Sequence, residues 1–250
     1  MSDPALLSVQ SADGYGYNDI AHHPAAAAAR VVVQLLRSRL TFTSVLDVGC
    51  GVGLWLSEYQ TQGIADIYGL DGPWVPQDNL VIPADKIRNH DLTTPFKLDR
   101  QFDLVMCLEV AEHLPESAAD GLLDSLTAHG GLILFSAAIP GQGGFQHVNE
   151  QFQDYWIKRF AARGFTAYDL LRPLIWNHPA VPYYYAQNAL IFSRQPLPFP
   201  TEFMPNPVHP ELYRRKCDPR NYSIKTIILH LPYYVIRYWR KSKISSLDQA

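Results

Sequence analysis

Residues 45–53, which read VLDVGCGVG, constrain the fold more than any other part of the chain. An apolar run ends at Asp47, glycines follow at positions 49, 51 and 53, and LWLSEYQ continues with helical character. This order predicts a strand, a tight turn and a helix, the opening of a nucleotide-type α/β domain. Glycine suits such a turn because a Cβ atom would block the close approach of a ligand to the backbone.

The glycine spacing argues against a dinucleotide cofactor. A dinucleotide-binding turn carries glycines at its first, third and sixth positions. Gly49 and Gly51 fit the first two positions, but Leu54 stands at the sixth. An oxidoreductase is therefore the least favoured enzyme class.

Strand and helix patterns alternate along the rest of the chain. Apolar runs predict strands within 44–48, 65–70, 86–89, 102–108, 130–138, 165–170 and 188–194. Helical patterns cover 25–40, 54–61, 116–128 and 150–162. Such alternation predicts a mostly parallel sheet covered by helices on both faces.

Chain length and cysteine content limit the classes of protein to which this sequence can belong. The 250 residues, 47% of them hydrophobic, suffice for one large domain or for a domain with an extension. The three cysteines have neither metal-binding spacing nor the density of a disulfide scaffold, and the first residues do not read as a signal peptide. These features predict a cytoplasmic protein.

Charge divides the chain unevenly. Residues 1–213 hold 12 Lys and Arg against 22 Asp and Glu, whereas 214–250 hold 9 against 2, so a basic tail follows an acidic body. Just before the basic tail, prolines at 196, 198, 200, 205, 207 and 210 exclude a helix or a central strand. This stretch is expected to be a linker or an ordered wrap across the body.

The tail allows two interpretations. Residues 222–243 mix Ile, Leu, Tyr and Trp with Arg and Lys, which predicts contact with the anionic inner face of a membrane. A C-terminal helix that packs on the body or on a second subunit would show the same pattern. RNA binding by the basic end is less favoured because the acidic body would repel phosphate. The oligomeric state does not follow from the sequence.

The motif VLDVGCGVG, followed by GLDG, HDL and FDLVMCLEVAEHL, resembles the class I S-adenosylmethionine (SAM)-dependent methyltransferases. The resemblance covers roughly residues 41–195. It implies a Rossmann-like fold with a seven-stranded, mostly parallel sheet and helices on both faces. In this arrangement residues 1–40 form an N-terminal segment and helix over the cofactor site, and residues 196–250 form a C-terminal extension.

The resemblance also implies a set of cofactor-binding residues. The residues of the glycine-rich turn, which are named at the end of this paragraph, would contact the amino-acid part of SAM. Asp71 would accept hydrogen bonds from the ribose hydroxyls. Asp91 and Leu92 would contact the adenine, and Leu108 and Glu109 would line the floor of the site. Asp71 could instead be a turn-forming residue before Gly72, and Asp91 a helix cap or loop residue. The residues of the glycine-rich turn are Asp47, Gly49, Gly51 and Gly53.

The segment EVAEH at 109–113 resembles two groups within this class, the ubiquinone-pathway O-methyltransferases and the small-RNA 3′-terminal 2′-O-methyltransferases. In a helix, Glu109, Glu112 and His113 would share one face. The resemblance implies that these three residues and His147 hold a divalent cation such as Mg²⁺, Mn²⁺ or Zn²⁺. A cation of this kind would bind adjacent acceptor oxygens and lower the pKa of one of them.

His113 and His147 have a second interpretation as general bases, because histidine titrates near neutral pH. His147 follows a glycine-rich stretch, GQGGFQ, of the kind that closes over an acceptor. A structural role for both histidines, or a surface position for His147 near a helix cap, stays open.

The expected reaction is methyl transfer from SAM to a hydroxyl of a sugar, a glycan or a related small molecule. The alternatives are an N-methyltransferase of a small molecule, an RNA 2′-O-methyltransferase and a non-catalytic SAM-binding protein. The intact set of cofactor positions argues against the last of these.

Overall fold

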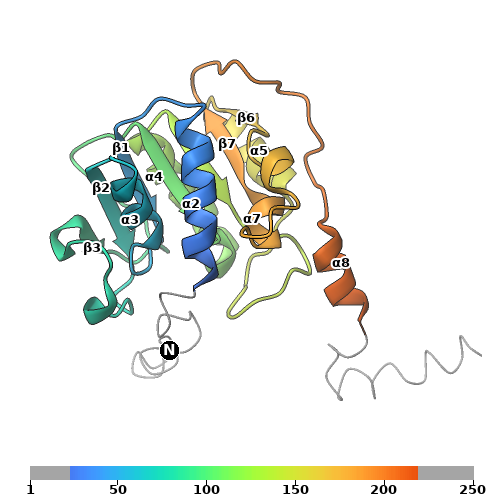
Figure 1. Cartoon of the computed structure of the whole chain (residues 1–250), viewed down its shortest axis with the longest axis horizontal. Helices are drawn as coiled ribbons and strands as arrows, with labels where there is room; N and C mark the ends of the chain where they lie inside the picture. Colours follow the sequence, from blue (N-terminus) through green and yellow to red (C-terminus); the bar gives the residue numbers. More distant parts are fainter. Residues whose placement is uncertain (1–22, 219–250) are drawn as a thin grey trace, which may run out of the picture. The chain divides into compact units, whose positions relative to one another are not determined.

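The computed structural model describes residues 23–218, and residues 1–22 and 219–250 lie outside this description. A seven-stranded sheet runs through the molecule in the order β3-β2-β1-β4-β5-β7-β6 (Figure 1). The pairings among β1 to β5 are parallel, and β7 is antiparallel to both β5 and β6. This confirms the predicted seven-stranded, mostly parallel sheet.

The central strands are buried along their whole length, as expected for parallel strands covered on both faces. All five residues of β1 and all five of β4 are buried. The strands are β1 (Ser44–Val48), β2 (Asp66–Asp71), β3 (Ile87–Asn89), β4 (Leu104–Leu108), β5 (Leu132–Ser136), β6 (Thr166–Tyr168) and β7 (Leu190–Ser193).

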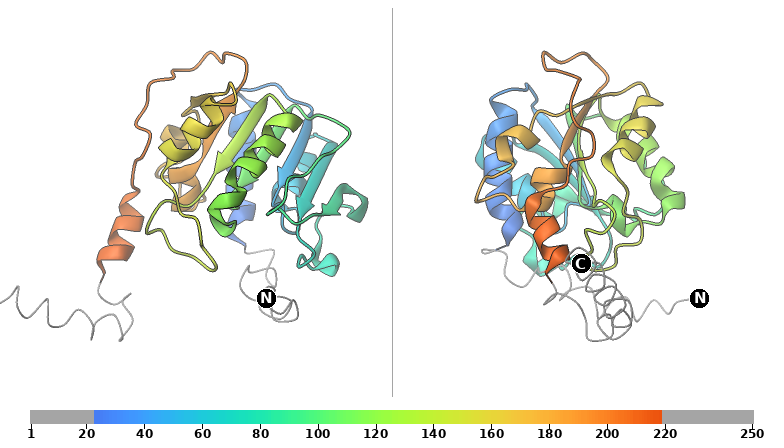
Figure 2. Two further views of the ribbon diagram at one scale, coloured as in Figure 1. Left: turned by 180° about the vertical axis from the view of Figure 1, so that it is seen from behind. Right: turned by 90° about the vertical axis from the view of Figure 1, so that its right-hand side faces the viewer.

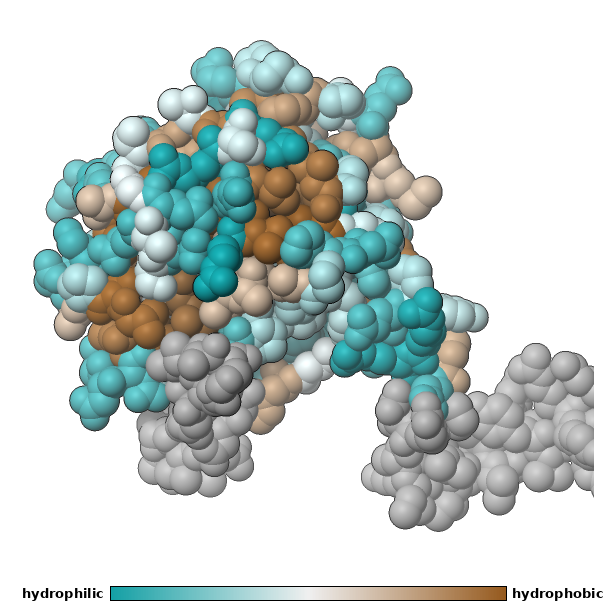
Figure 3. Space-filling model, in the orientation of Figure 1, coloured by the Kyte–Doolittle hydropathy of each residue, from teal (hydrophilic) through white to brown (hydrophobic). Residues whose placement is uncertain are grey.

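Helix α2 (Pro24–Arg37) opens the described chain. Pro24 occupies its first turn, where the missing N–H costs nothing, and His23 Nδ1 accepts a hydrogen bond from the Ala25 N–H. The inner side of the helix carries only Ala, Val and Leu, whereas Arg30, Gln34 and Arg37 are exposed. These exposed residues account for the hydrophilic band over α2 in the middle of Figure 3.

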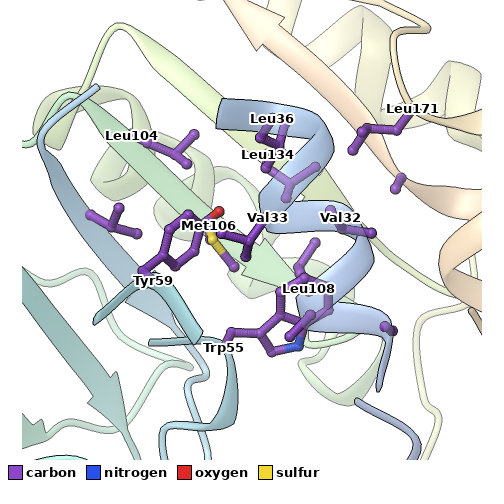
Figure 4. Close-up of a cluster of buried hydrophobic side chains, with 14 of the residues drawn as sticks. Val32, Val33, Leu36, Trp55, Tyr59, Leu104, Met106, Leu108, Leu134 and Leu171 are labelled. Carbon is purple, nitrogen blue, oxygen red and sulfur yellow. The ribbon is translucent and has the colours of Figure 1, made fainter. Parts of the chain in front are cut away.

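One face of the sheet packs against α2, α3 (Leu54–Thr61), α6 (Arg172–Ile175) and α7 (Tyr183–Asn188). Figure 4 shows how Val32, Val33 and Leu36 of α2 meet Trp55 and Tyr59 of α3 above the strands. The sheet contributes alternate residues to this cluster, among them Leu104, Met106, Leu108 and Leu134. This side of the core fixes the helix that follows the glycine-rich turn.

The opposite face packs against α4 (Ala119–His129) and α5 (Gln153–Ala161), which Figure 2 shows from behind. Its centre is aromatic: the rings of Phe160 and Phe192 stack with centroids 4.0 Å apart, and Phe135 contacts Trp156 at 5.0 Å. The sheet therefore lies between two layers of helices, as predicted.

Three local predictions are wrong. The helix expected to begin at residue 150 begins at Gln153, because the Glu150 side chain accepts a hydrogen bond from the Gly141 N–H of the preceding loop. The chain does not turn into an α-helix directly after β4 but passes through two 3-10 turns, Ala111–His113 and Glu116–Ala118. The strand expected from residue 188 begins at Leu190, since Pro182 starts the unpredicted helix α7 that ends at Asn188.

The proline-rich stretch after β7 makes ordered contacts with the body. Arg172 donates hydrogen bonds to the carbonyl oxygens of Met204 and Pro205, at 2.8 and 3.2 Å, and Asn206 donates to Asp154 at 3.1 Å. The chain divides into two compact units, Met1–His209 and Pro210–Ala250. In the second unit the described helix is α8 (Pro210–Cys217), where Arg215 pairs with Glu211 at 2.6 Å.

A search of residues 23–218 finds no helix with the length and apolar character needed to span a bilayer. The predicted membrane-contacting or packing segment, residues 222–243, lies outside the described residues.

Candidate functional site

The glycine-rich turn lies between β1 and α3, at the carboxyl edge of the sheet. Gly49, Gly51 and Gly53 all have left-handed φ angles, of 82°, 53° and 90°. A Cβ atom on Gly49 would also overlap Val110 of the segment that follows β4. The turn is therefore glycine-rich both because of its backbone conformation and because a neighbouring segment packs on it.

Asp71 ends β2 beside this turn. Its Oδ2 accepts a hydrogen bond from the Gly51 N–H and its Oδ1 one from the Gly72 N–H, both at 2.6 Å. Burial raises the pKa of Asp71, and hydrogen bonds from these two amides and from Trp74 oppose the rise. The carboxylate thus braces the glycine-rich turn at the end of β2.

Asp47 lies one strand away and is buried, and its Oδ2 has no hydrogen-bond partner among the described residues. Burial, together with the charge of Asp71, raises the pKa of Asp47 to about 8. A buried carboxylate oxygen without a donor is costly, so this position favours a ligand that brings a donor or a positive charge.

The remaining predicted cofactor residues follow the neighbouring strands. Leu92 and Leu108 are buried, and Asp91 is exposed just after β3. The Asp91 Oδ1 accepts hydrogen bonds from the Thr93 N–H and hydroxyl at 2.9 and 2.7 Å, and these lower its pKa. Asp91 therefore caps its own turn, which is the local role that the sequence left open.

Glu109 follows β4 with a left-handed φ of 54°. Its carboxylate accepts hydrogen bonds from Gln142 Nε2 at 3.1 Å and from Asn188 Nδ2 at 3.1 Å. Gln187 Nε2 donates to the side-chain oxygens of both amide residues, at 3.2 and 2.9 Å. Burial raises the pKa of Glu109, and the hydrogen bonds from these amides partly offset the rise.

Glu109, Glu112 and His113 do not share a helix face as expected, because the left-handed Glu109 and the short 3-10 turn redirect the chain. The structure instead gathers Glu112, His113 and His147, with one ligand atom from each lying within 4.8 Å of the others. The two imidazole rings meet edge to face, with centroids 4.9 Å apart.

Their surroundings favour the neutral forms of the Glu112 carboxyl group and the His113 imidazole. Glu112 is fully buried and neither of its carboxylate oxygens makes a well-formed hydrogen bond among the described residues. Burial and the nearby charge of Glu109 raise the pKa of Glu112 well above its ordinary value. Burial, and then the charge of His147, lower the pKa of His113 to about 4, so His113 is neutral at pH 7.

His147 is held by a residue that sequence reasoning placed in a helix. Its Nδ1 lies 2.9 Å from Glu150 Oε1. Glu150 is thus part of the site, together with Gln142, Asn188 and Val110, none of which the sequence singled out. The position of Glu150 three residues after His147 was the one signal that could have found it, and it has a local helical explanation as well.

Comparison with known proteins identifies the family. Residues 20–171, more than half of the chain, match the family described as a methyltransferase domain. The chain belongs to this methyltransferase family. The match includes the glycine-rich turn, Asp71, the segment after β4 and His147.

The curated relatives of this methyltransferase chain include ubiquinone biosynthesis O-methyltransferases. The enzyme of Bordetella avium is 32% identical over 119 residues, which are 42% of this chain and 46% of the relative. The enzyme of Hydrogenovibrio crunogenus is 28% identical over 136 residues, 48% of each chain. The chain thus spans about half the length of the curated relatives it matches.

Solved structures of methyltransferases share the fold at low sequence identity. DesVI of Streptomyces venezuelae superposes with a TM-score of 0.55 at 17% identity, covering 75% of this chain and 99% of that one. The sugar N-methyltransferase KedS8 of a Streptoalloteichus species gives 0.54 at 16% identity, covering 72% and 91%. These likenesses establish the Rossmann-like class I methyltransferase fold.

Proposed function

We propose that the chain is a SAM-dependent methyltransferase that methylates a hydroxyl oxygen of a sugar, a glycan or a related small molecule. The observation that carries the proposal is the pair of contacting imidazoles, His113 and His147, beside the buried Glu112. This cluster follows β4 and β5, next to the edge that carries the glycine-rich turn and Asp71.

The proposal that the chain binds SAM rests on how the chemical groups of SAM match the side chains of the site. SAM carries an ammonium and a sulfonium, and the Oδ2 of the buried Asp47, which lacks a partner among residues 23–218, suits a cationic or donor group. Asp71 offers carboxylate oxygens at the end of β2, where a ribose can donate two hydroxyls. The family membership supports the same cofactor.

When bound, SAM supplies a methyl group that is already activated by the sulfonium charge. The tasks left to the chain are to orient the acceptor oxygen in line with that methyl group and to accept the hydroxyl proton. His113 is neutral at pH 7, but its lowered pKa of about 4 makes it a weak base, so it suits the first task better than the second. His147 lies in contact with it and can serve as the base or orient the acceptor.

The same cluster supports a second form of the proposal, in which a divalent cation takes part. Of Mg²⁺, Mn²⁺ and Zn²⁺, the carboxylate of Glu112 and the two imidazoles suit Zn²⁺ best, because Mg²⁺ and Mn²⁺ prefer oxygen ligands. Glu112, His113 and His147 would hold the ion, whereas the oxygens of Glu109 are engaged by Gln142 and Asn188. Such an ion would stabilise an acceptor alkoxide as a Lewis acid.

Calorimetry separates the two forms. Titration with SAM, and then with each cation in the presence of SAM, is carried out on the full chain and on Glu112→Ala. Stoichiometric cation binding that is lost in Glu112→Ala supports the metal form. Binding of SAM without a cation supports the form in which a histidine is the base. Absence of SAM binding would overturn both forms.

The acceptor is tested with methyl-labelled SAM and a panel of hydroxyl- and amine-bearing sugars, phenols and small RNAs. We expect label on oxygen of a small molecule. Label found only on nitrogen would favour the small-molecule N-methyltransferase, and label found only on RNA the 2′-O-methyltransferase. Either of these outcomes would contradict the proposed acceptor.

We further propose a cytoplasmic location, with residues 222–243 contacting the inner face of a membrane. Support comes from the mixture of aromatic and basic residues in this segment. Co-sedimentation with vesicles of anionic lipid tests the contact. Loss of sedimentation on deletion of this segment is the expected result, and equal sedimentation of both proteins would contradict it.

A further inference from the structure

Glu150 satisfies three donors from the loop between β5 and α5. Its Oε2 accepts the Gly141 N–H at 2.7 Å, and its Oε1 accepts the Gly143 N–H at 2.5 Å. The same Oε1 lies 2.9 Å from His147 Nδ1. Hydrogen bonds to a carboxylate are about twice as strong as neutral ones, so one side chain organises residues 141–147.

The far end of this loop is fixed by the main chain. The Val148 and Asn149 N–H groups both donate to the Glu112 carbonyl oxygen, at 2.8 and 3.0 Å. The Gln151 N–H donates to the Ala138 carbonyl oxygen at 3.1 Å. Glu150 is therefore held in place on both sides, which allows its carboxylate to act as a fixed point for the loop.

His147 is confined from several directions. A Cβ atom on Gly144 would overlap its Nε2, so the ring packs directly on the loop backbone. His113 contacts it edge to face at an interplanar angle of 88°. The preceding Gln146 has a left-handed φ of 55°, a conformation that persists only where the surroundings impose it.

The hydrogen bond from His147 to Glu150 has a definite direction. Both Glu150 oxygens already accept backbone N–H groups, so the carboxylate acts as an acceptor throughout and His147 Nδ1 must be the donor. The proton on Nδ1 leaves Nε2 as the nitrogen with a lone pair in the neutral ring.

We propose that Glu150 is a positioning residue that holds His147 in its Nδ1–H tautomer and ties this tautomer to the closed loop at 141–147. The inference rests on the proposed role of His147 in the acceptor site. Acting through His147, Glu150 leaves Nε2 as the atom that can take an acceptor proton or bind a cation, and the loop cannot open without releasing the ring.

Nitrogen NMR of the full chain tests the proposal without any acceptor. Long-range proton–nitrogen spectra of ¹⁵N-histidine-labelled protein at pH 8 report the tautomer of each ring, and His147→Gln assigns the signals. We expect the Nδ1–H pattern for His147 in the wild type. In Glu150→Ala the Nε2–H form, which free histidine prefers, should become the major species. Glu202→Ala, an exposed carboxylate in the proline-rich stretch, serves as the matched control.

Amide hydrogen exchange gives a second readout with the milder variant Glu150→Gln, in case Glu150→Ala does not fold. Exchange of the Gly141 and Gly143 amides should become at least about tenfold faster, whereas Glu202→Ala leaves it unchanged. An unchanged tautomer in folded Glu150→Ala, or unchanged exchange in Glu150→Gln, would overturn the inference. Neither readout uses methyl transfer, so label appearing only on nitrogen would refute the acceptor assignment and leave this result standing.

Discussion

At the scale of single residues, the site is built from carboxyl groups whose environments set their protonation. Asp47 and Glu112 are buried with oxygens that lack a partner in the described part of the chain, whereas Asp71 and Glu109 accept hydrogen bonds from amides. Burial raises the pKa of both of the first two groups. The four carboxyl groups of the site therefore differ in their partners among residues 23–218: Asp71 is bonded to the backbone of the turn, Glu109 to two side-chain amides, and Asp47 and Glu112 to neither.

Asp47 should make the stability of the ligand-free protein depend on pH. Its native pKa of about 8 lies above the ordinary value of 3.8, so between these values the native state keeps a proton that the unfolded state releases. The free energy of unfolding should therefore fall as pH rises from 4 to 8, by up to about 1.4 kcal/mol per pH unit from this group. The free energy of unfolding, measured with urea at a series of pH values, should fall less steeply with pH in Asp47→Asn than in the wild type. Asp78→Asn serves as the control and should keep the pH dependence of the wild type. The same pH dependence in Asp47→Asn would contradict this expectation.

Asp71 should be required for cofactor binding. Substitution by Ala would remove the proposed acceptor for two ribose hydroxyls, and hydrogen bonds to charged groups are worth about 1.5–3 kcal/mol each. Calorimetry should show SAM affinity reduced by at least about 100-fold in Asp71→Ala. Asp78→Ala, an exposed carboxylate in the next loop, should bind like the wild type. A folded Asp71→Ala with wild-type affinity would refute the ribose role, and circular dichroism checks folding.

At the scale of elements, the turn after β1 and the segment after β4 pack on each other at Gly49 and Val110. Gly141 provides a matched comparison, because it has the same φ of 82° as Gly49 but a Cβ atom added there would meet no atom of the described chain within 4 Å. Gly141→Ala should cost only the strain of the left-handed backbone, about 1 kcal/mol.

Gly49→Ala should cost about 1–3 kcal/mol more than Gly141→Ala, because overpacking adds to the same backbone strain. The measurement is the free energy of unfolding in urea for both variants. Adding Val110→Ala should recover part of the difference in the Gly49→Ala background. Equal destabilisation by the two glycine substitutions would show that packing against Val110 contributes nothing.

The central strands and the glycine-rich turn could be predicted because their signals are local. A buried parallel strand such as β1 shows as a mostly apolar run, and Gly51 shows as a glycine where the turn needs a left-handed backbone. The segment after β4 could not be predicted in detail. Nothing in EVAEH indicates that Glu109 adopts a left-handed conformation, which depends on hydrogen bonds to Gln142 and Asn188, 33 and 79 residues away.

The role of Glu150 could not be predicted from the local sequence either. An acidic residue before an aromatic, amphipathic stretch predicts a helix start, and α5 does begin three residues later. What placed Glu150 outside the helix was its set of loop donors, Gly141, Gly143 and His147. Local propensity located the helix, and only the folded loop determined where the carboxylate is used.

At the scale of the whole molecule, the first compact unit is closed by a chain segment without regular structure. Arg172 anchors the proline-rich stretch: it is 2% exposed, pairs with Asp169 at 2.9 Å and donates to the carbonyl oxygens of Met204 and Pro205. Prolines lack N–H donors, so the carbonyl groups of this stretch need a donor from elsewhere. The guanidinium supplies it.

Arg172→Leu should destabilise the protein by about 3–5 kcal/mol, because it leaves Asp169 and two carbonyl groups without their partner. Arg100→Leu removes an exposed pair with Asp66 and should cost no more than about 1 kcal/mol. Thermal and urea unfolding measure both effects. Limited proteolysis should cleave Arg172→Leu within 196–209 faster than Arg100→Leu, and equal cleavage would contradict the anchoring role.

The contact between Gly49 and Val110 also bears on how such a site can be re-engineered. A library that randomises the turn after β1 while Val110 is kept should return only glycine at position 49, since every other side chain meets the valine methyl groups. A side chain at position 49 therefore has to be sought together with a smaller residue at position 110.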